Sequence, residues 1–179
     1  TFGTAAADDL IVRVANVYEK GERIAFGSLP EVLNVDAAGG DDHLMISASF
    51  ADTTNIFGGA DHDTFDIVGT THIQNLSAMM GSGNDTVIIR KVADSTTLVV
   101  DGQDDDDHFV VGTYTVANLG NLGQIRGGLS IIGGSSNSGD SLLVNDGALG
   151  NNFSYVITDQ HILNDSEPHG VDRPEFAGV

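Results

Sequence analysis

Residues 56–67, IFGGADHDTFDI, and residues 100–111, VDGQDDDDHFVV, align without a gap. Both segments start with an apolar residue and carry Gly at the third place, acidic residues in the middle, Asp at the eighth place and Phe at the tenth. Gly-rich polar segments between short apolar runs are typical of turns that join β-strands. The same turn occurring twice in one chain indicates a repeated structural unit.

The turn recurs along the chain at a nearly constant interval. In each copy it closes with an Asp, which is followed by a small residue or His and then by an apolar residue. These residues are Asp42, Asp63, Asp85 and Asp107, at intervals of 21, 22 and 22 residues. A looser copy ends at Asp140, 33 residues further on, and an insertion around residues 119–129 accounts for the longer interval. Residues 42–65 and 85–109 also share the order of their features, which suggests a unit of two coils.

Short apolar runs between the turns predict strands. Residues 65–68, 87–89 and 109–111 are examples, and no stretch shows the sustained 3.6-residue period of a helix. Strands that recur at a fixed interval of this length favour an all-β solenoid. We therefore expect a parallel β-helix with about 22 residues per coil and about seven or eight coils. A β-sandwich, which also uses short strands and frequent turns, is the alternative.

The domain prediction is a single solenoid segment over residues 1–179. The repeats are clearest over residues 33–146. Residues 153–179 begin like residues 9–35, with a strand, a polar loop and a strand, so residues 147–179 are interpreted as the start of another copy. A solenoid without polar caps exposes strand edges, which suggests as partners either copies of the chain stacked end to end or neighbouring repeats of the same chain.

Composition narrows the possible partners. Seven basic and 26 acidic residues give a formal net charge of −19, which argues against nucleic acid and favours divalent cations. There is no Cys, so neither disulfides nor thiolate chemistry is available. No apolar run approaches the roughly 20 residues of a transmembrane helix. The start at Thr1, without a signal-peptide pattern, suggests a piece of a longer protein.

Stacked coils would bring the acidic turns together. With coils about 4.8 Å apart, equivalent carboxylates would repel one another unless solvent and salt screened them, backbone N–H groups bonded them, or a divalent cation lay between coils. Calcium suits the third arrangement because it takes six to eight oxygen ligands from carboxylates and carbonyls. The candidate metal ligands are Asp41, Asp42, Asp61, Asp63, Asn84, Asp85, Asp104, Asp105, Asp106 and Asp107.

Residues 58–66, GGADHDTFD, and 81–88, GSGNDTVI, resemble the hemolysin-type (RTX) calcium repeats. With their longer period, the turns look even more like the coil arrays of very large secreted or surface proteins of bacteria. The resemblance covers about residues 33–146. It implies a β-helix with calcium between its turns and an extracellular or cell-surface location. RTX nonapeptides run in tandem with two turns per coil, whereas one such turn occurs per period here.

The functional prediction is a structural segment and not an enzyme. A catalytic site needs one constellation of carboxylates and basic groups, whereas nearly all carboxylates here lie in repeated turns. We expect a stiff acidic rod in an extracellular bacterial surface, adhesin or filament protein, with calcium as the possible cofactor. The alternative is a carbohydrate-active β-helix enzyme or a carbohydrate-binding module.

The histidines of the repeats have structural interpretations. His43 and His108 hold equivalent places directly after the turn Asp, where other copies have Thr or Ser, so a hydrogen-bonding corner role is expected. His62 lies inside an acidic turn, where it is expected to offset negative charge.

Overall fold

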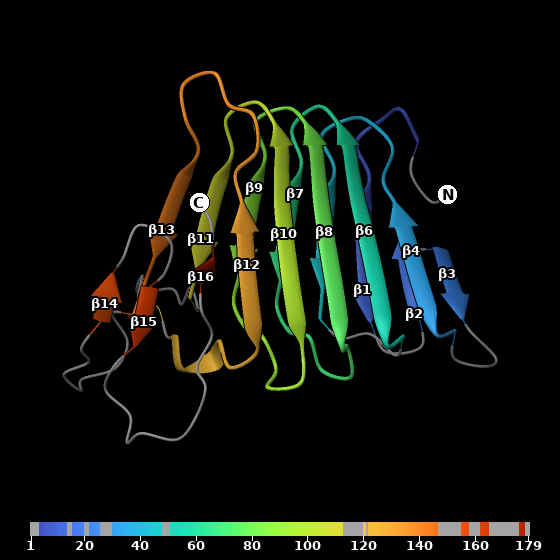
Figure 1. Ribbon diagram of the computed structural model, residues 1–179. Coiled ribbons are helices and arrows are strands. Elements are labelled where there is room, and N and C mark those ends of the chain that lie inside the picture. Colours follow the sequence, from blue (N-terminus) through green and yellow to red (C-terminus); the bar gives the residue numbers. More distant parts are fainter. Residues whose placement is uncertain are drawn as a thin grey trace.

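The computed structural model describes residues 4–13, 16–19, 22–25, 30–47, 51–112, 120 and 122–146, together with strand segments 155–157, 162–164 and 176–177. In this part of the chain the regular elements are strands and one short 3₁₀-helix, η1 (Leu122–Gln124). All strands but one pair near the C-terminal end of the chain form two sheets that lie face to face, with the chain alternating between them along the stack (Figure 1). The all-β parallel β-helix expected from the sequence is therefore confirmed.

The front sheet of Figure 1 runs parallel throughout. Its strands in spatial order are β16 (Phe176–Ala177), β12 (Gly128–Ile132), β10 (Thr97–Asp104), β8 (Asn75–Ser82), β6 (Thr53–Ala60) and β4 (Val32–Asp36).

The back sheet is parallel from β13 to β1 and then continues in antiparallel strands. Its strands in spatial order are β13 (Ser141–Val144), β11 (His108–Val111), β9 (Thr86–Ile89), β7 (Thr64–Ile67), β5 (His43–Ile46), β1 (Asp9–Arg13), β2 (Asn16–Glu19) and β3 (Glu22–Ala25).

The core is formed by the residues at every second place along each strand, which point between the two sheets. In β6, Thr54, Ile56 and Gly58 are buried while the residues between them are partly exposed, and β8 and β10 repeat this pattern. Parallel pairing places equivalent residues directly above one another, so the buried positions form continuous rows. In the back sheet one fully buried row contains Leu44, Phe65, Val87 and Phe109. The strands thus form because their apolar residues recur every second place and meet the same kind of residue in the next coil.

The expected number of coils is wrong. The described residues form about four turns rather than seven or eight. At the N-terminal end, β2 and β3 extend the back sheet beyond β1 as an antiparallel meander instead of further coils. After it, β14 (Tyr155–Ile157) and β15 (Ile162–Asn164) pair antiparallel in a sheet of their own.

The last coil contains an insertion. Paired residues are 22 apart from β8 to β10 (Asn75 with Thr97) but 31 apart from β10 to β12 (Thr97 with Gly128). The offset reaches 33 from β11 to β13 (His108 with Ser141), so most of the added residues lie between β11 and β12 and two lie in the turn before Asp140. The predicted insertion around residues 119–129 overlaps the segment between β11 and β12 and extends two residues into β12; residues 113–119 and 121 are outside the described part.

The sequence predicts the start of a second copy over residues 147–179. Most of residues 147–179 lie outside the described part of the chain, apart from β14, β15 and β16.

Candidate functional site

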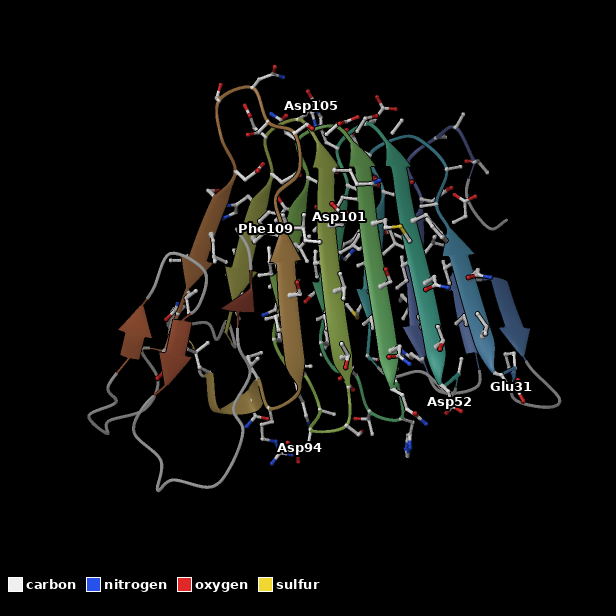
Figure 2. All side chains as sticks on the ribbon, viewed as in Figure 1. Glu31, Asp52, Asp94, Asp101, Asp105 and Phe109 are labelled. Atoms are coloured by element: carbon white, nitrogen blue, oxygen red, sulfur yellow. The ribbon has the colours of Figure 1, made fainter. Side chains whose placement is uncertain are left out.

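The predicted acidic turns all lie along one edge of the molecule, where the chain passes from a front strand to a back strand. We call this the acidic edge and define it by residues 37–42, 59–63, 81–85, 103–107 and 133–140. Figure 2 shows Asp105 at this edge, while Asp52 and Asp94 lie at the opposite edge. The stacking of the turns expected from the sequence follows from the register, because His43, Thr64, Thr86, His108 and Ser141 are successive partners and each follows a turn Asp.

The turn aspartates are joined by hydrogen bonds from coil to coil. The backbone N–H of Asp42 donates to Oδ1 of Asp63 at 2.9 Å, and that of Asp63 donates to Oδ1 of Asp85 at 2.7 Å. The same bond links Asp85 to Asp107 at 2.9 Å and Asp107 to Asp140 at 3.0 Å. The members of this inner Asp ladder are Asp8, Asp42, Asp63, Asp85, Asp107 and Asp140.

Burial leaves one oxygen of several ladder residues without a partner. Asp63, Asp85 and Asp107 are 1–2% exposed. Within the described residues, no hydrogen-bond donor reaches their Oδ2 atoms, which are buried. A buried carboxylate oxygen without a donor is costly and calls for a proton, a cation or a water.

The pKa values of three ladder aspartates are raised, as their burial leads one to expect. Burial raises the pKa of Asp63 to about 6, with the neighbouring Asp42, Asp41 and Asp61 charges adding to the rise. Burial, then the Asp63 and Asp107 charges, raises the pKa of Asp85 to about 7. The pKa of Asp107 is raised to about 6, again chiefly by burial. The ladder is therefore disfavoured as a row of bare negative charges at neutral pH.

Glycines face the unpartnered oxygens. A Cβ added to Gly58 would clash with both Oδ2 of Asp63 and the carbonyl oxygen of Met80 on the next coil. A Cβ at Gly102 would likewise clash with Oδ2 of Asp107 and the carbonyl oxygen of Gly133. A carboxylate oxygen and a carbonyl oxygen thus face the same small space in both coils.

The residue before each ladder Asp forms a second row, the outer ladder, which runs in the opposite direction. Oδ1 of Asp41 accepts the N–H of His62 at 3.0 Å, and Nδ1 of His62 accepts the N–H of Asn84 at 3.0 Å. Oδ1 of Asn84 accepts the N–H of Asp106 at 3.3 Å. In the outer ladder the side chain of one coil accepts a backbone N–H from the next coil. In the inner ladder the side chain accepts a backbone N–H from the preceding coil.

The outer ladder ends at Asp106, whose Oδ1 accepts the N–H groups of Asn137, Ser138 and Gly139. The amides of Ser138 and Gly139 are the main cause that lowers the pKa of Asp106. This carboxylate is held as an anion by backbone donors.

His62 has a role that the sequence did not reveal. The sequence predicts that it offsets charge, and His62 does act to lower the pKa of Asp85 against the larger effect of burial. In addition, its Nδ1 is a hydrogen-bond acceptor that takes the place of a carboxylate or amide oxygen in the outer ladder. The expected corner role is seen for His108, whose Nδ1 lies 2.6 Å from Oγ of Ser141, and His43 Nδ1 lies 3.3 Å from Oδ1 of Asp9.

One place in the turn alternates between Gly and Asp. Gly40, Asp61, Gly83 and Asp105 all have a positive φ, between 76° and 125°. The N–H of Gly40 donates to Oδ2 of Asp61, and that of Gly83 donates to Oδ2 of Asp105, each at 3.2 Å. This alternation gives a physical basis for the two-coil unit suggested by the sequence.

The predicted metal ligands are thus divided among separate rows. The inner ladder holds Asp42, Asp63, Asp85 and Asp107, and the outer ladder holds Asp41, Asn84 and Asp106. Asp61 and Asp105 occupy the alternating place, and Asp104 is exposed at the end of β10. Within the described residues, no group of three or more acidic or His side chains is close enough to hold a metal ion by itself.

The sequence pattern did not include Asp8 in the ladder. The N–H of Asp8 donates to Oδ1 of Asp42, and Asp8 is followed by an alternating strand like the other members, but no Gly-rich turn precedes it. The alternation of polar and apolar residues after Asp8 is the only feature of the sequence that could have indicated its place in the ladder.

The inner ladder nevertheless fits a calcium ion in its donor chemistry. Calcium takes carboxylate and carbonyl oxygens and completes its shell with water. The groups that would hold it are Oδ2 of Asp63, Asp85 and Asp107, together with the carbonyl oxygen of Met80 beside Asp63 and that of Gly133 beside Asp107.

Comparisons with known proteins do not assign the chain. It matches no family model, and neither the curated proteins nor the solved structures give a match. Among the described residues, no helix is both long and apolar enough to cross a membrane.

Proposed function

We propose that this chain is a structural repeat segment of an extracellular bacterial surface, adhesin or filament protein, where it forms a stiff acidic rod that calcium stabilises. The observation that carries the proposal is the inner Asp ladder, which repeats one buried carboxylate per coil. A repeated feature suits a structural role, because catalysis needs a single constellation.

Stiffness is supported by the way the coils are joined. Each coil is bonded to the next through two parallel sheets, the inner ladder and the outer ladder. Bending the rod would stretch several of these rows together, whereas a chain of domains on linkers bends at each linker.

Calcium is proposed because the ladder lacks positive charge of its own. The unpartnered oxygens of Asp63 and Asp107 are buried beside carbonyl groups, and the charges that raise the pKa of Asp63 are carboxylates. A divalent cation between coils would reverse the repulsion and supply a partner for these oxygens. Location outside the cell and membership of a surface protein come from the resemblance to RTX-type coil arrays.

A thermal melt in chelator and in millimolar calcium tests the proposal. Ligand that binds only the folded chain raises stability by about 2.7 kcal/mol at 100 times its Kd, so a clear rise in Tm is expected. Magnesium at the same concentration should raise Tm less, because it demands a smaller octahedral site and releases water reluctantly.

Asp85→Asn is the informative variant. The substituted amide keeps an Oδ1 acceptor for the N–H of Asp63, so folding in chelator should be retained, while the charge needed by a cation is lost. The calcium-dependent rise in Tm should shrink, whereas Asp52→Asn at the opposite edge should leave it unchanged. Asp63→Ala and Asp107→Ala would be less selective because they also remove an acceptor of the ladder. A folded chain whose Tm is the same in calcium and in chelator would rule out the calcium part of the proposal.

A further inference from the structure

The two ends of the solenoid differ in how well they are closed. In the back sheet, Leu10 and Val12 of β1 are fully buried although they belong to the first parallel strand. At the other end, Leu142 and Val144 of β13 occupy the same two rows but are only partly buried. The core is therefore covered at the N-terminal end and partly open at β13.

The inner ladder shows the same asymmetry. At its N-terminal end the chain provides its own cap, because the N–H and Oγ1 of Thr4 both donate to Oδ2 of Asp8, at 2.8 and 3.1 Å. At its C-terminal end Oδ1 of Asp140 accepts the N–H of Asp107. The N–H of Asp140 has no acceptor within the described part of the chain, so the ladder stops on a donor that faces the next coil.

The edge of β13 is also chemically different from the edges at the other end. Its residues are uncharged, and Leu143 is 47% exposed on the outer face. By contrast, the edge strand β4 is preceded by Pro30 and Glu31 and ends with Asp36, which are residues that discourage strand addition. Among the described strands, β13 pairs only with β11.

We propose that β13 and the Asp140 turn, at the C-terminal end of the back sheet, form a docking face for one further Asp turn and back-sheet strand of another solenoid segment; in the front sheet β16 already pairs with β12. The docking strand runs parallel to β13 and is preceded by an Asp whose carboxylate accepts the N–H of Asp140. The inference deepens the proposed rod function and rests on it for the kind of partner, but it does not depend on calcium.

The partner's chemistry follows from the rows already in place. Continuing the stack requires apolar residues opposite Leu142 and Val144 and a carboxylate opposite Asp140, which is the pattern of every coil from Asp42 onward. The N-terminal end of a second copy does not offer this pattern, because Thr4 already caps Asp8 and the strands β2 and β3 lie beyond β1.

A peptide with the sequence of residues 80–90, MGSGNDTVIIR, is the probe. It carries the ladder Asp85, the strand β9 and no net charge, so it avoids general repulsion by the acidic chain. Labelled with a fluorophore and titrated with the full chain, it should show saturable binding by fluorescence anisotropy. The same peptide with Asp85→Ala should bind at least ten-fold more weakly, because it cannot accept the N–H of Asp140.

Two variants of the chain locate the binding. The N–H of Ser141 donates to the carbonyl oxygen of Asp107, and the N–H of Asn145, directly after β13, donates to that of Val111. Successive N–H groups of a strand point to opposite sides, so the N–H of Val144 points away from β11. Val144→Pro removes that donor and should abolish peptide binding, whereas Val32→Pro at the front-sheet edge β4 should leave binding unchanged. If Val144→Pro fails to fold, the comparison of the two peptides on the unaltered chain still decides the matter.

Three results would overturn the proposal. Failure of the unaltered peptide to bind would mean that the chain covers its own C-terminal end. Equal binding of the Asp85→Ala peptide would mean that the ladder does not select the partner. Dimers of the unaltered chain in sedimentation velocity that are lost in Val144→Pro would make a second copy the occupant. Each is independent of the calcium melt, so the two proposals can fail separately.

Discussion

The backbone N–H of Asp63 donates to Oδ1 of Asp85 across 2.7 Å, from one coil to the next. The carboxylates that repeat in the sequence therefore serve first as acceptors for backbone groups of the neighbouring turn. This explains how a row of like charges is tolerated in a folded chain, because each carboxylate satisfies a buried donor that would otherwise be costly. It also leaves one oxygen of Asp63, Asp85 and Asp107 available for a proton or a cation.

The first prediction concerns pH in the absence of metal. The pKa values of Asp63, Asp85 and Asp107 are raised from 3.8 to about 6, 7 and 6. The folded chain thus binds protons more tightly than the unfolded chain, so this stabilisation is complete below about pH 4 and is lost as pH rises through 6 to 7. Tm measured in chelator should fall steadily between pH 5 and pH 8.

Asp106 has the opposite effect on the pH dependence of stability. Its pKa is lowered in the folded chain, so the stabilisation it provides is lost as the pH falls through its folded-state pKa. The control for the first prediction is Asp85→Asn, which should flatten the fall above pH 5. A Tm that rises from pH 5 to pH 8 in chelator would contradict the burial of these carboxylates.

The second prediction tests the core rows. Phe65 and Phe109 are fully buried, so replacing either with Ala should lower the free energy of unfolding by about 3–5 kcal/mol. Phe57 points out of the front sheet and is partly exposed. Replacing it with Ala should lower the free energy of unfolding by clearly less. Urea denaturation of the three variants measures the difference, and equal losses would show that the assigned faces are wrong.

The third prediction tests the turn geometry. Gly59 has a φ of 115°, and a Cβ there would clash with the carbonyl group of Ala38 on the preceding coil. Gly59→Ala should therefore destabilise the chain by about 1–3 kcal/mol. Gly128→Ala is the matched control, because the nearest atom to its Cβ would lie 3.9 Å away, and chemical denaturation should find it nearly neutral.

The fourth prediction concerns an ion pair on the outer face of the back sheet. Arg90 contacts both carboxylate oxygens of Asp66, at 2.6 and 3.2 Å, and both side chains are partly buried. A double-mutant cycle should give a coupling of about 1 kcal/mol that weakens with added salt. The exposed pair Arg126 and Asp94 is the control, and its coupling should be close to zero.

Local sequence determined much of this architecture. Gly and Asp at fixed places specify where the chain turns, and apolar residues at every second place specify which side of each strand is buried. The period of 21 to 22 residues then places Asp42, Asp63, Asp85 and Asp107 in one row, because stacked coils align equivalent residues. The inward orientation of Phe65 and Phe109 follows from the same alternation.

Tertiary structure decided what the period could not. Nothing in the repeat pattern indicates that Asp63 turns one oxygen toward the preceding coil while Asp41 accepts from the following one, since that depends on which atoms of separate turns meet. Nor does the pattern show that His62 acts as an acceptor or that Asp8 joins the ladder. The antiparallel meander at the N-terminal end likewise depends on contacts between segments, as does the place of β13 as the last back-sheet strand among those that the structure describes. Periodicity specifies which residues share a row, and only the packed coils determine which atoms within the row bind one another.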